Sequence, residues 1–272
     1  MTGETYRLAR TVEGRQLVGD GAGFVPLSTA GYDTTNDALG ATVPSLDELP
    51  ASRTPVESLR FATPFDPGKL WGIGLNYADH AADLDAARPA EPASFMKPRT
   101  TLTAPGGPIR LPPPAESERV TAEAELGVVI GRTSRDVDEA AFDDVVAGFV
   151  PILDMTAEDV LQRNPRFLTR SKSYDTFLVV GPWLSAPATA DRLADVTVRT
   201  VINGDVIAEK SLDRTLFSPP ELVSFHSRVM TLEAGDVIAT GTPGAGVIKA
   251  GDTVRAEIDG VGVLEADVTD SE

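Results

Sequence analysis

The sequence contains no cysteine. This absence excludes disulfides, thiolate metal sites and cysteine nucleophiles, and it gives no sign of an oxidising compartment. Basic residues are also scarce, because 24 Lys and Arg stand against 41 Asp and Glu, for a net charge of −17. Such a surface repels polyphosphate, so we expect neither a nucleic acid nor an anionic membrane as a partner.

Long apolar runs are absent as well. The longest are only several residues, far below the roughly 20 that a membrane-spanning helix needs. The first residues, Met1 to Arg7, lack a basic region followed by an apolar run, so no signal peptide is expected. We therefore expect a cytoplasmic protein. Its 42% hydrophobic and 24% charged residues are ordinary for a globular chain with a sizeable core.

The chain consists mainly of short apolar segments separated by turns. Residues 1–65 contain short strands joined by Gly-containing links, and we expect a small, separate α/β unit there. Residues 66–272 form the main domain, in which strands outnumber helices too heavily for a doubly wound sheet. The fold class is therefore β-rich α+β. Its helices are expected at 75–83, 134–142, 156–162 and 219–230.

Three carboxylates lie on apolar strands. Glu123 and Glu125 project to the same side of the predicted strand 120–130, and Asp154 closes a second apolar strand. Carboxylates in apolar surroundings must take up a proton, pair with a base or hold a cation. Three of them together suggest a site for a hard divalent cation. A Glu-x-Glu on a strand is more often the solvated face of an antiparallel sheet, and the spacing alone leaves this interpretation open.

The two histidines of the chain have different surroundings. His226 lies within a helical apolar spacing, which favours a structural role. His80 follows a predicted strand, and Asp83 comes three residues later. On a helix these two side chains share a face, so the carboxylate can orient the imidazole as a general base. An accidental pair on a surface helix is the alternative.

Two lysines and one threonine are further candidates. Lys172 lies in a polar stretch without helical or strand periodicity, and it could stabilise an oxyanion, although a solvated loop lysine is commoner. Lys97 follows two large apolar residues but reads as a surface lysine on that alone. The segment 241–246 lacks both nucleotide-binding motifs. A sharp turn there could still bring backbone N–H groups and the Thr242 hydroxyl toward an anion.

Seven short motifs occur in a fixed order along the chain. They are Gly74–His80, Phe95–Pro98, Glu123–Gly127, Leu153–Ala157, Lys172–Phe177, Gly181–Leu184 and Gly235–Pro243. Together they resemble the fumarylacetoacetate hydrolase family over roughly residues 66–268. The chain looks most like its small members, similar to acylpyruvate hydrolases, oxaloacetate decarboxylases and hydroxymuconate-type isomerases. The resemblance implies a mixed β-roll, a homodimer, and Mg²⁺ or Mn²⁺ held by Glu123, Glu125 and Asp154.

The resemblance also implies how a site in this chain would work. His80 with Asp83 would be the base, Lys172 and Lys97 would lie near a small 2-oxo acid substrate, and Thr242 would contact its carboxylate. The expected reaction is hydrolysis of a C–C bond in a 2,4-dioxo acid such as an acylpyruvate or fumarylpyruvate, by water that His80 activates. Without an attacking water, the same site would decarboxylate oxaloacetate or shift a double bond.

Three positions depart from the family pattern. Asp83 stands where similar enzymes often have Glu, Glu158 replaces an Arg, and Leu161 replaces a Gln that commonly orients substrate. Gln162 is one position over, which on a helix is about 100° round the axis. These departures keep open a catalytically silent protein that binds metal or a 2-oxo acid.

Overall fold

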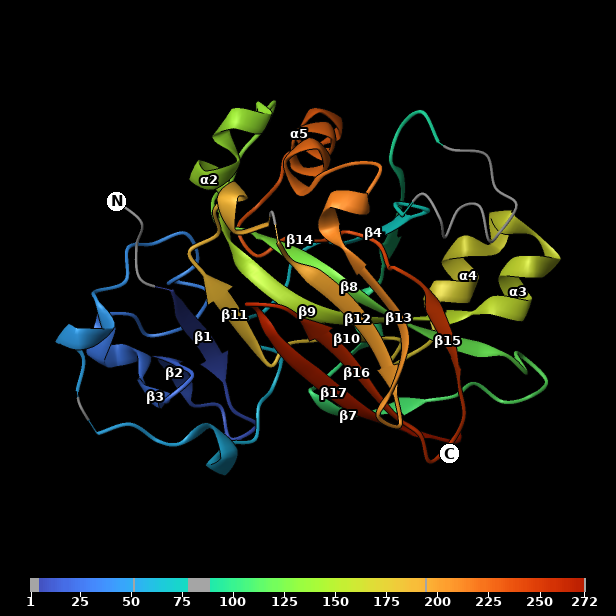
Figure 1. Ribbon diagram of the computed structural model, residues 1–272, viewed down its shortest axis with the longest axis horizontal. Coiled ribbons are helices and arrows are strands. Elements are labelled where there is room, and N and C mark those ends of the chain that lie inside the picture. Colours follow the sequence, from blue (N-terminus) through green and yellow to red (C-terminus); the bar gives the residue numbers. More distant parts are fainter. Residues whose placement is uncertain (1–4, 51, 78–88, 194, 272) are drawn as a thin grey trace.

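A computed structural model describes residues 5–50, 52–77, 89–193 and 195–271. Two β-sheets make up most of the described chain, and the few helices lie at their margins (Figure 1). This confirms the β-rich α+β class. None of the described helices is long and apolar enough to cross a membrane.

The larger sheet has 12 strands, and most of them follow one path. The order along this path is β3 (Gly23–Pro26), β2 (Gln16–Asp20), β1 (Tyr6–Arg10), β11 (Trp183–Ala186), β9 (Val146–Ala157), β8 (Val120–Ile130), β14 (Val237–Ala239), β4 (Leu70–Gly74) and β5 (Ala93–Lys97). Off this path, β10 (Leu178–Val180) pairs with β9 and β6 (Leu102–Thr103), and β15 (Ala245–Ile248) pairs with β8.

The smaller sheet has five strands. Their order is β13 (Asp205–Ser211), β12 (Thr197–Ile202), β16 (Thr253–Ile258), β17 (Gly262–Thr269) and β7 (Gly106–Arg110). Two connections of this sheet are hairpin turns. Asn203 and Gly204 both have positive φ, of 53° and 89°, between β12 and β13, and Gly260, with φ of 69°, lies between β16 and β17. Two positive φ values are what a tight type I′ turn requires, and Asn and Gly tolerate them best.

The first strands extend the larger sheet. β1 pairs antiparallel with β11, with Leu8 opposite Leu184, and Leu8 belongs to the same buried cluster as Val150 and Ile152 of β9. The N-terminal residues therefore share a sheet and a hydrophobic core with the rest of the chain. A domain boundary near residue 65 stays a prediction.

The antiparallel ribbon of β8 and β9 is the centre of the fold. All residues of β9 are buried, and ten of the eleven residues of β8 are too, so both strands are covered on each face. This explains why both read as nearly continuous apolar runs instead of alternating ones. Polar side chains on this ribbon are consequently enclosed.

The helices differ in part from those expected. The helix α5 (Pro219–Val229) is confirmed, and it begins with a capping box between Ser218 and Glu221. A helix over 134–142 is wrong, because the chain forms only a 3₁₀ turn, Glu139–Ala141, and the short α2 (Phe142–Val145). The backbone N–H groups of Asp136 and Val137 are bound by Ser227 of α5 instead.

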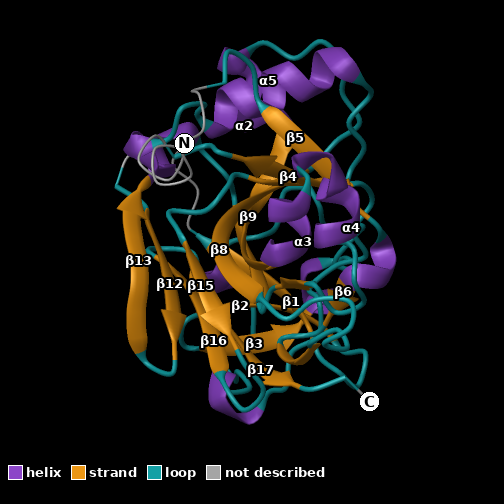
Figure 2. Cartoon of the chain, turned by 90° about the vertical axis from the view of Figure 1, so that its right-hand side faces the viewer, coloured by secondary structure: helices purple, strands orange, loops and turns teal. Residues whose placement is uncertain are grey.

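Two short helices lie next to each other beyond the end of β9 (Figure 2). The helix α3 (Glu158–Arg163) begins later than predicted, since Thr156 continues β9 and does not cap the helix. The helix α4 (Leu168–Lys172) was not predicted, because barely more than one turn offers no apolar period to recognise. Lys172 is therefore the last residue of a helix that packs against β9 and β5.

Short 3₁₀ helices complete the described chain. They are Leu27–Ala30, Leu46–Glu48, Val56–Ser58, Arg99–Thr101, Pro165–Phe167, Ala190–Leu193 and Leu212–Arg214.

Candidate metal centre

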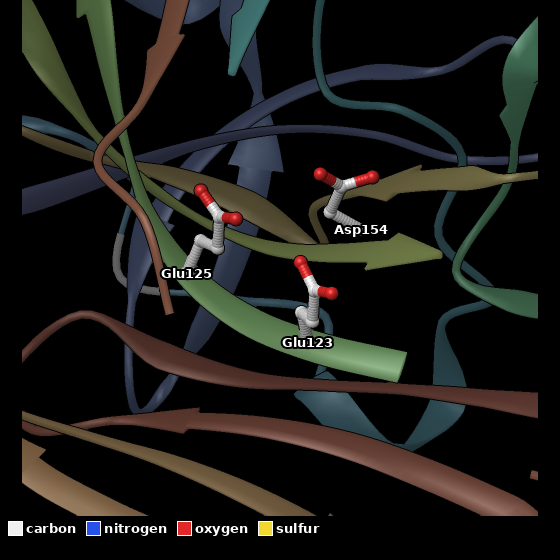
Figure 3. A group of neighbouring side chains, drawn as sticks. All are labelled: Glu123, Glu125 and Asp154. Carbon is white, nitrogen blue, oxygen red and sulfur yellow. The ribbon is translucent and has the colours of Figure 1, made fainter. Parts of the chain in front are cut away.

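Glu123, Glu125 and Asp154 come together on one face of the β8–β9 ribbon (Figure 3). Glu123 lies directly opposite Asp154 in the register, and Glu125 is two residues further along the same face. One carboxylate oxygen from each lies within 4.8 Å of the others. Glu125 and Asp154 are only 2% and 1% exposed. The interpretation as a solvated sheet face is therefore wrong.

Two buried lysines pair with two of these acids, Glu123 and Asp154. Lys172 Nζ lies 2.7 Å from Glu123 Oε2 and 2.7 Å from Asp154 Oδ2. Lys97 Nζ donates to the other oxygen of Asp154. Both lysines are 5% exposed, so neither is a solvated surface lysine. We call Glu123, Glu125, Asp154, Lys97 and Lys172 the interior cluster.

Glu125 has no lysine partner in the described structure. Its Oε2 accepts the backbone N–H of Gly241 at 2.8 Å, on the loop between β14 and β15. Glu123 is held differently, because its Oε1 accepts from the Thr156 hydroxyl at 2.8 Å. Each acid is thus fixed by a group from another segment of the chain.

Burial and charge shift the pKa values within the interior cluster. Burial raises the pKa of Glu125 well above its usual range, and the charge of Asp154 raises it further. Burial acts in the same direction on Asp154, but the ammonium groups of Lys172 and Lys97 outweigh it and lower its pKa. Burial lowers the pKa of Lys97 to about 8, against the opposing effect of Asp154. Burial also acts to lower the pKa of Lys172, yet the carboxylates around it raise that pKa overall.

The cluster fits a divalent cation. Its three carboxylates face two ammonium groups, so the ionised cluster carries an excess of negative charge in a buried place. Carboxylate oxygens are the ligands that Mg²⁺ and other hard cations prefer. The buried hydroxyls of Tyr77 and Thr240 have no hydrogen-bond partner among the described residues. Burial raises the pKa of Tyr77, and the charge of Glu125 raises it further.

Thr242 lies one residue beyond Gly241 on the same loop. Its hydroxyl donates to the Gly244 carbonyl at 3.0 Å and accepts the Gly244 N–H at 3.3 Å. The loop is thus a sharp turn whose Gly241 N–H reaches the interior cluster, while the Thr242 hydroxyl bonds within the turn. A contact between Thr242 and a substrate carboxylate stays a prediction.

His80 and Asp83 lie outside the described residues, as do residues 78–83 of the helix expected over 75–83. Its described start, 75–77, is not helical, because Leu75 has a φ of 57° and Tyr77 forms a β-bridge with Thr215. The role of His80 and Asp83 as base and orienting acid stays a prediction. The other histidine, His226, is fully buried in α5, with Nδ1 2.7 Å from the Leu222 carbonyl oxygen and its ring against Trp71. This packing supports its structural role.

Glu158 is directed away from the interior cluster. Its carboxylate pairs with Arg119 just before β8 and accepts from Gln162 Nε2 at 3.0 Å. Beside it, Asp159 pairs with Arg163 at 3.3 Å. We call Arg119, Glu158, Asp159 and Arg163 the α3 cluster. Its members join the start of β8 to α3, and Glu158 takes a structural role where relatives are expected to have Arg.

Asn76 is a residue that sequence reasoning missed. Its side chain is 1% exposed and binds the backbone of Thr240 and Phe217. These partners are 164 and 141 residues away, so nothing in the local spacing indicates the contact.

Comparison with known proteins agrees with this architecture. Residues 69–269 match the family model of the fumarylacetoacetate hydrolase C-terminal domain. A mitochondrial oxaloacetate decarboxylase of Dictyostelium discoideum is 37% identical over 186 residues, which are 66% of this chain and 84% of that protein. An uncharacterized protein of Archaeoglobus fulgidus is 41% identical over 196 residues, 72% of this chain and 76% of that protein.

A solved structure of 5-carboxymethyl-2-hydroxymuconate delta-isomerase from Mycobacterium smegmatis is also similar. It superposes with a TM-score of 0.79 and 32% identity, covering 97% of this chain and all of that one. The β-rich fold, the ordered motifs and the matched 69–269 region lead to one conclusion. The chain belongs to the fumarylacetoacetate hydrolase family.

Proposed function

We propose that this protein is a Mg²⁺- or Mn²⁺-dependent hydrolase that cleaves a C–C bond in a 2,4-dioxo acid of the acylpyruvate or fumarylpyruvate type. The observation that carries the proposal is the interior cluster, in which three enclosed carboxylates outnumber the two lysines beside them. Glu123, Glu125 and Asp154 would hold the cation. With a divalent cation the cluster becomes net positive, which suits a 2-oxo acid anion.

When bound, the cation would act as a Lewis acid and a template for the two oxygens of a 2-oxo acid. The lysines complete the site. Lys172 is fixed 2.7 Å from each of two carboxylates, so its ammonium stays charged and oriented at the place where substrate would lie. A preorganised cation there stabilises negative charge that develops on a carbonyl oxygen under attack. His80, oriented by Asp83, would take the proton from the attacking water.

Decarboxylation of a 2-oxo acid such as oxaloacetate, or a hydroxymuconate-type isomerisation, is the second candidate. It is favoured by the relatives, because one is named a decarboxylase and another an isomerase. Glu158 bears instead on a third candidate, a catalytically silent protein that binds metal or a 2-oxo acid, because its carboxylate is bound by Arg119 and Gln162 and does not replace the expected Arg. The homodimer expected from the family is part of the same proposal.

The test is turnover of acetylpyruvate, fumarylpyruvate and oxaloacetate with Mg²⁺, with Mn²⁺ and with a chelator. We expect metal-dependent cleavage of at least one 2,4-dioxo acid. Turnover of oxaloacetate alone would favour the second candidate. No turnover of any of the three, with metal binding intact, would leave a metal- or 2-oxo-acid-binding protein and overturn the hydrolase.

His80→Ala separates the two reactions. We expect this variant to suppress hydrolysis more strongly than decarboxylation, because only hydrolysis needs an activated water. An equal loss of both activities would count against a water-activating role for His80.

A further inference from the structure

Asn76 connects three segments of the chain at the end of β4. Its Nδ2 donates to the Thr240 carbonyl at 2.7 Å and to the Phe217 carbonyl at 3.0 Å. Its Oδ1 accepts the Phe217 N–H at 2.9 Å. The side chain is 1% exposed, so these contacts are enclosed and compete with no water.

The Thr240 carbonyl belongs to the same peptide unit as the Gly241 N–H, and this N–H donates to Glu125 Oε2 at 2.8 Å. A peptide unit is planar, so a group that fixes the carbonyl also fixes the direction of the N–H. Asn76 and Glu125 thus hold opposite sides of one rigid plane. Hydrogen bonds in such a chain strengthen each other in an enclosed site.

The backbone at Gly241 is shaped for this approach. Its φ is +92°, and a Cβ at this position would lie 2.9 Å from Asn76 Cβ and 3.0 Å from the Ile73 carbonyl oxygen. Any side chain here would therefore both strain the backbone and push Asn76 away. The glycine lets the loop come close enough to Asn76 for the 2.7 Å contact at Thr240.

We propose that Asn76 is a positioning residue of the metal centre, which orients the Glu125 carboxylate through the Thr240–Gly241 peptide. The inference rests on the proposed function, because it takes Glu125 as a metal ligand. Partners that orient a ligand from behind typically change metal affinity by about 10–100-fold when they are removed. Among the interior cluster, the described hydrogen bonds link Asn76 only to Glu125, and they do so through the Thr240–Gly241 peptide.

The test compares Asn76→Asp with Asn36→Asp. Both replacements keep the side-chain shape, remove the NH₂ donor and add a carboxylate. Asn36 is a matched control, because its Nδ2 donates to the Asp66 carbonyl at 3.0 Å and its Oδ1 accepts the Asp66 N–H at 2.8 Å. Mg²⁺ and Mn²⁺ affinity is measured by calorimetry, and the bound Mn²⁺ is examined by electron paramagnetic resonance.

We expect Asn76→Asp to bind both ions about 10–100-fold more weakly and to change the Mn²⁺ spectrum, while Asn36→Asp matches the wild type. A folded Asn76→Asp with wild-type affinity and spectrum overturns the inference and leaves the metal centre standing. A wild-type protein that binds neither ion overturns the metal centre and, with it, the inference.

A measurement on the wild type covers the case in which Asn76→Asp does not fold. In ¹⁵N-labelled protein, the Gly241 amide and the Asn76 side-chain amide should both shift when Mg²⁺ is added, and the Asn36 side-chain amide should not. Metal binding that moves the Gly241 signal but leaves Asn76 unchanged also overturns the inference.

Discussion

Two charged clusters, one on the β8–β9 ribbon and one just beyond the end of it, are built from the same kinds of side chain but differ in burial. The interior cluster is enclosed, with Asp154 and both lysines no more than 5% exposed. In the α3 cluster, the Arg119 side chain is 51% exposed and that of Glu158 is 23% exposed. Arg119 is only four residues from Glu123 along the chain. Water screens the outer pairs, whereas the inner charges need partners to be stable at all.

Burial, more than the presence of acids and bases, distinguishes the interior cluster from the α3 cluster. Exposed ion pairs typically contribute no more than about 1 kcal/mol to stability. Removal of one partner from a buried pair costs about 3–5 kcal/mol, because a charge is left enclosed and unpaired. Substitutions of equal chemistry in the two clusters should therefore differ sharply in effect.

Asp154→Asn should produce the largest difference. This substitution removes a proposed ligand, and we expect Mg²⁺ affinity and metal-dependent activity to fall by more than about 100-fold, which exceeds the usual effect of residues behind the ligands. Asp159→Asn is the matched control in the α3 cluster and should bind Mg²⁺ as the wild type does. Calorimetry measures both, and circular dichroism checks the fold. Equal Mg²⁺ affinity in the two variants would refute the metal assignment.

Lys172→Met should come next, with an effect on stability. Without this ammonium, Glu123 and Asp154 face each other inside the protein, so the metal-free variant should lose about 3–5 kcal/mol of unfolding free energy. Mg²⁺ should recover part of that loss, because it supplies the missing positive charge.

The control for Lys172 is Arg119→Met, which unpairs Glu158 in the α3 cluster and should cost no more than about 1 kcal/mol. Urea unfolding with chelator and with Mg²⁺ measures all three proteins. If the two variants lose the same stability, the contrast between the clusters is wrong.

The smallest expected effect is the pH-dependent contribution of Asp159, in the α3 cluster, to the free energy of unfolding. Burial acts to raise the pKa of Asp159, but its hydrogen bond from Ser117 and the charge of Arg163 outweigh burial and lower that pKa. An acid whose folded pKa lies below its unfolded value, about 3.9, stabilises the protein above that pH. This contribution is lost as the pH falls through the folded pKa.

Asp159→Asn should therefore be no more than about 1 kcal/mol less stable than the wild type near neutral pH, the usual limit for a partly exposed ion pair. The difference should shrink toward zero once the pH falls below the lowered pKa of the folded state, where the wild-type acid is protonated in both states. Urea unfolding of both proteins across this pH range provides the measurement. A difference that is constant with pH would show that Asp159 acts without its charge.

Much of the fold could be read from local patterns. The Asn203-Gly204 turn, the cap and prolines of α5, and the two long apolar strands each depend on residues close together in the sequence. The helices that were wrongly predicted or missed are either very short or depend on contacts with distant segments. The helix expected over 134–142 does not form, because backbone N–H groups in that segment bond to Ser227 of α5. The helix α4 is too short to show a helical period of apolar residues.

The sequence by itself determined the three carboxylates, the order of the family motifs and the shared face of Glu123 and Glu125, because these depend only on residue identity and strand period. Only the tertiary structure decided which lysine side chains pair with these carboxylates. Lys97 and Lys172 reach Asp154 from 57 and 18 residues away, and Asn76 reaches Thr240 across 164. Such contacts depend on strand register and on the packing of α4, and neither can be read from the spacing of residues along the sequence.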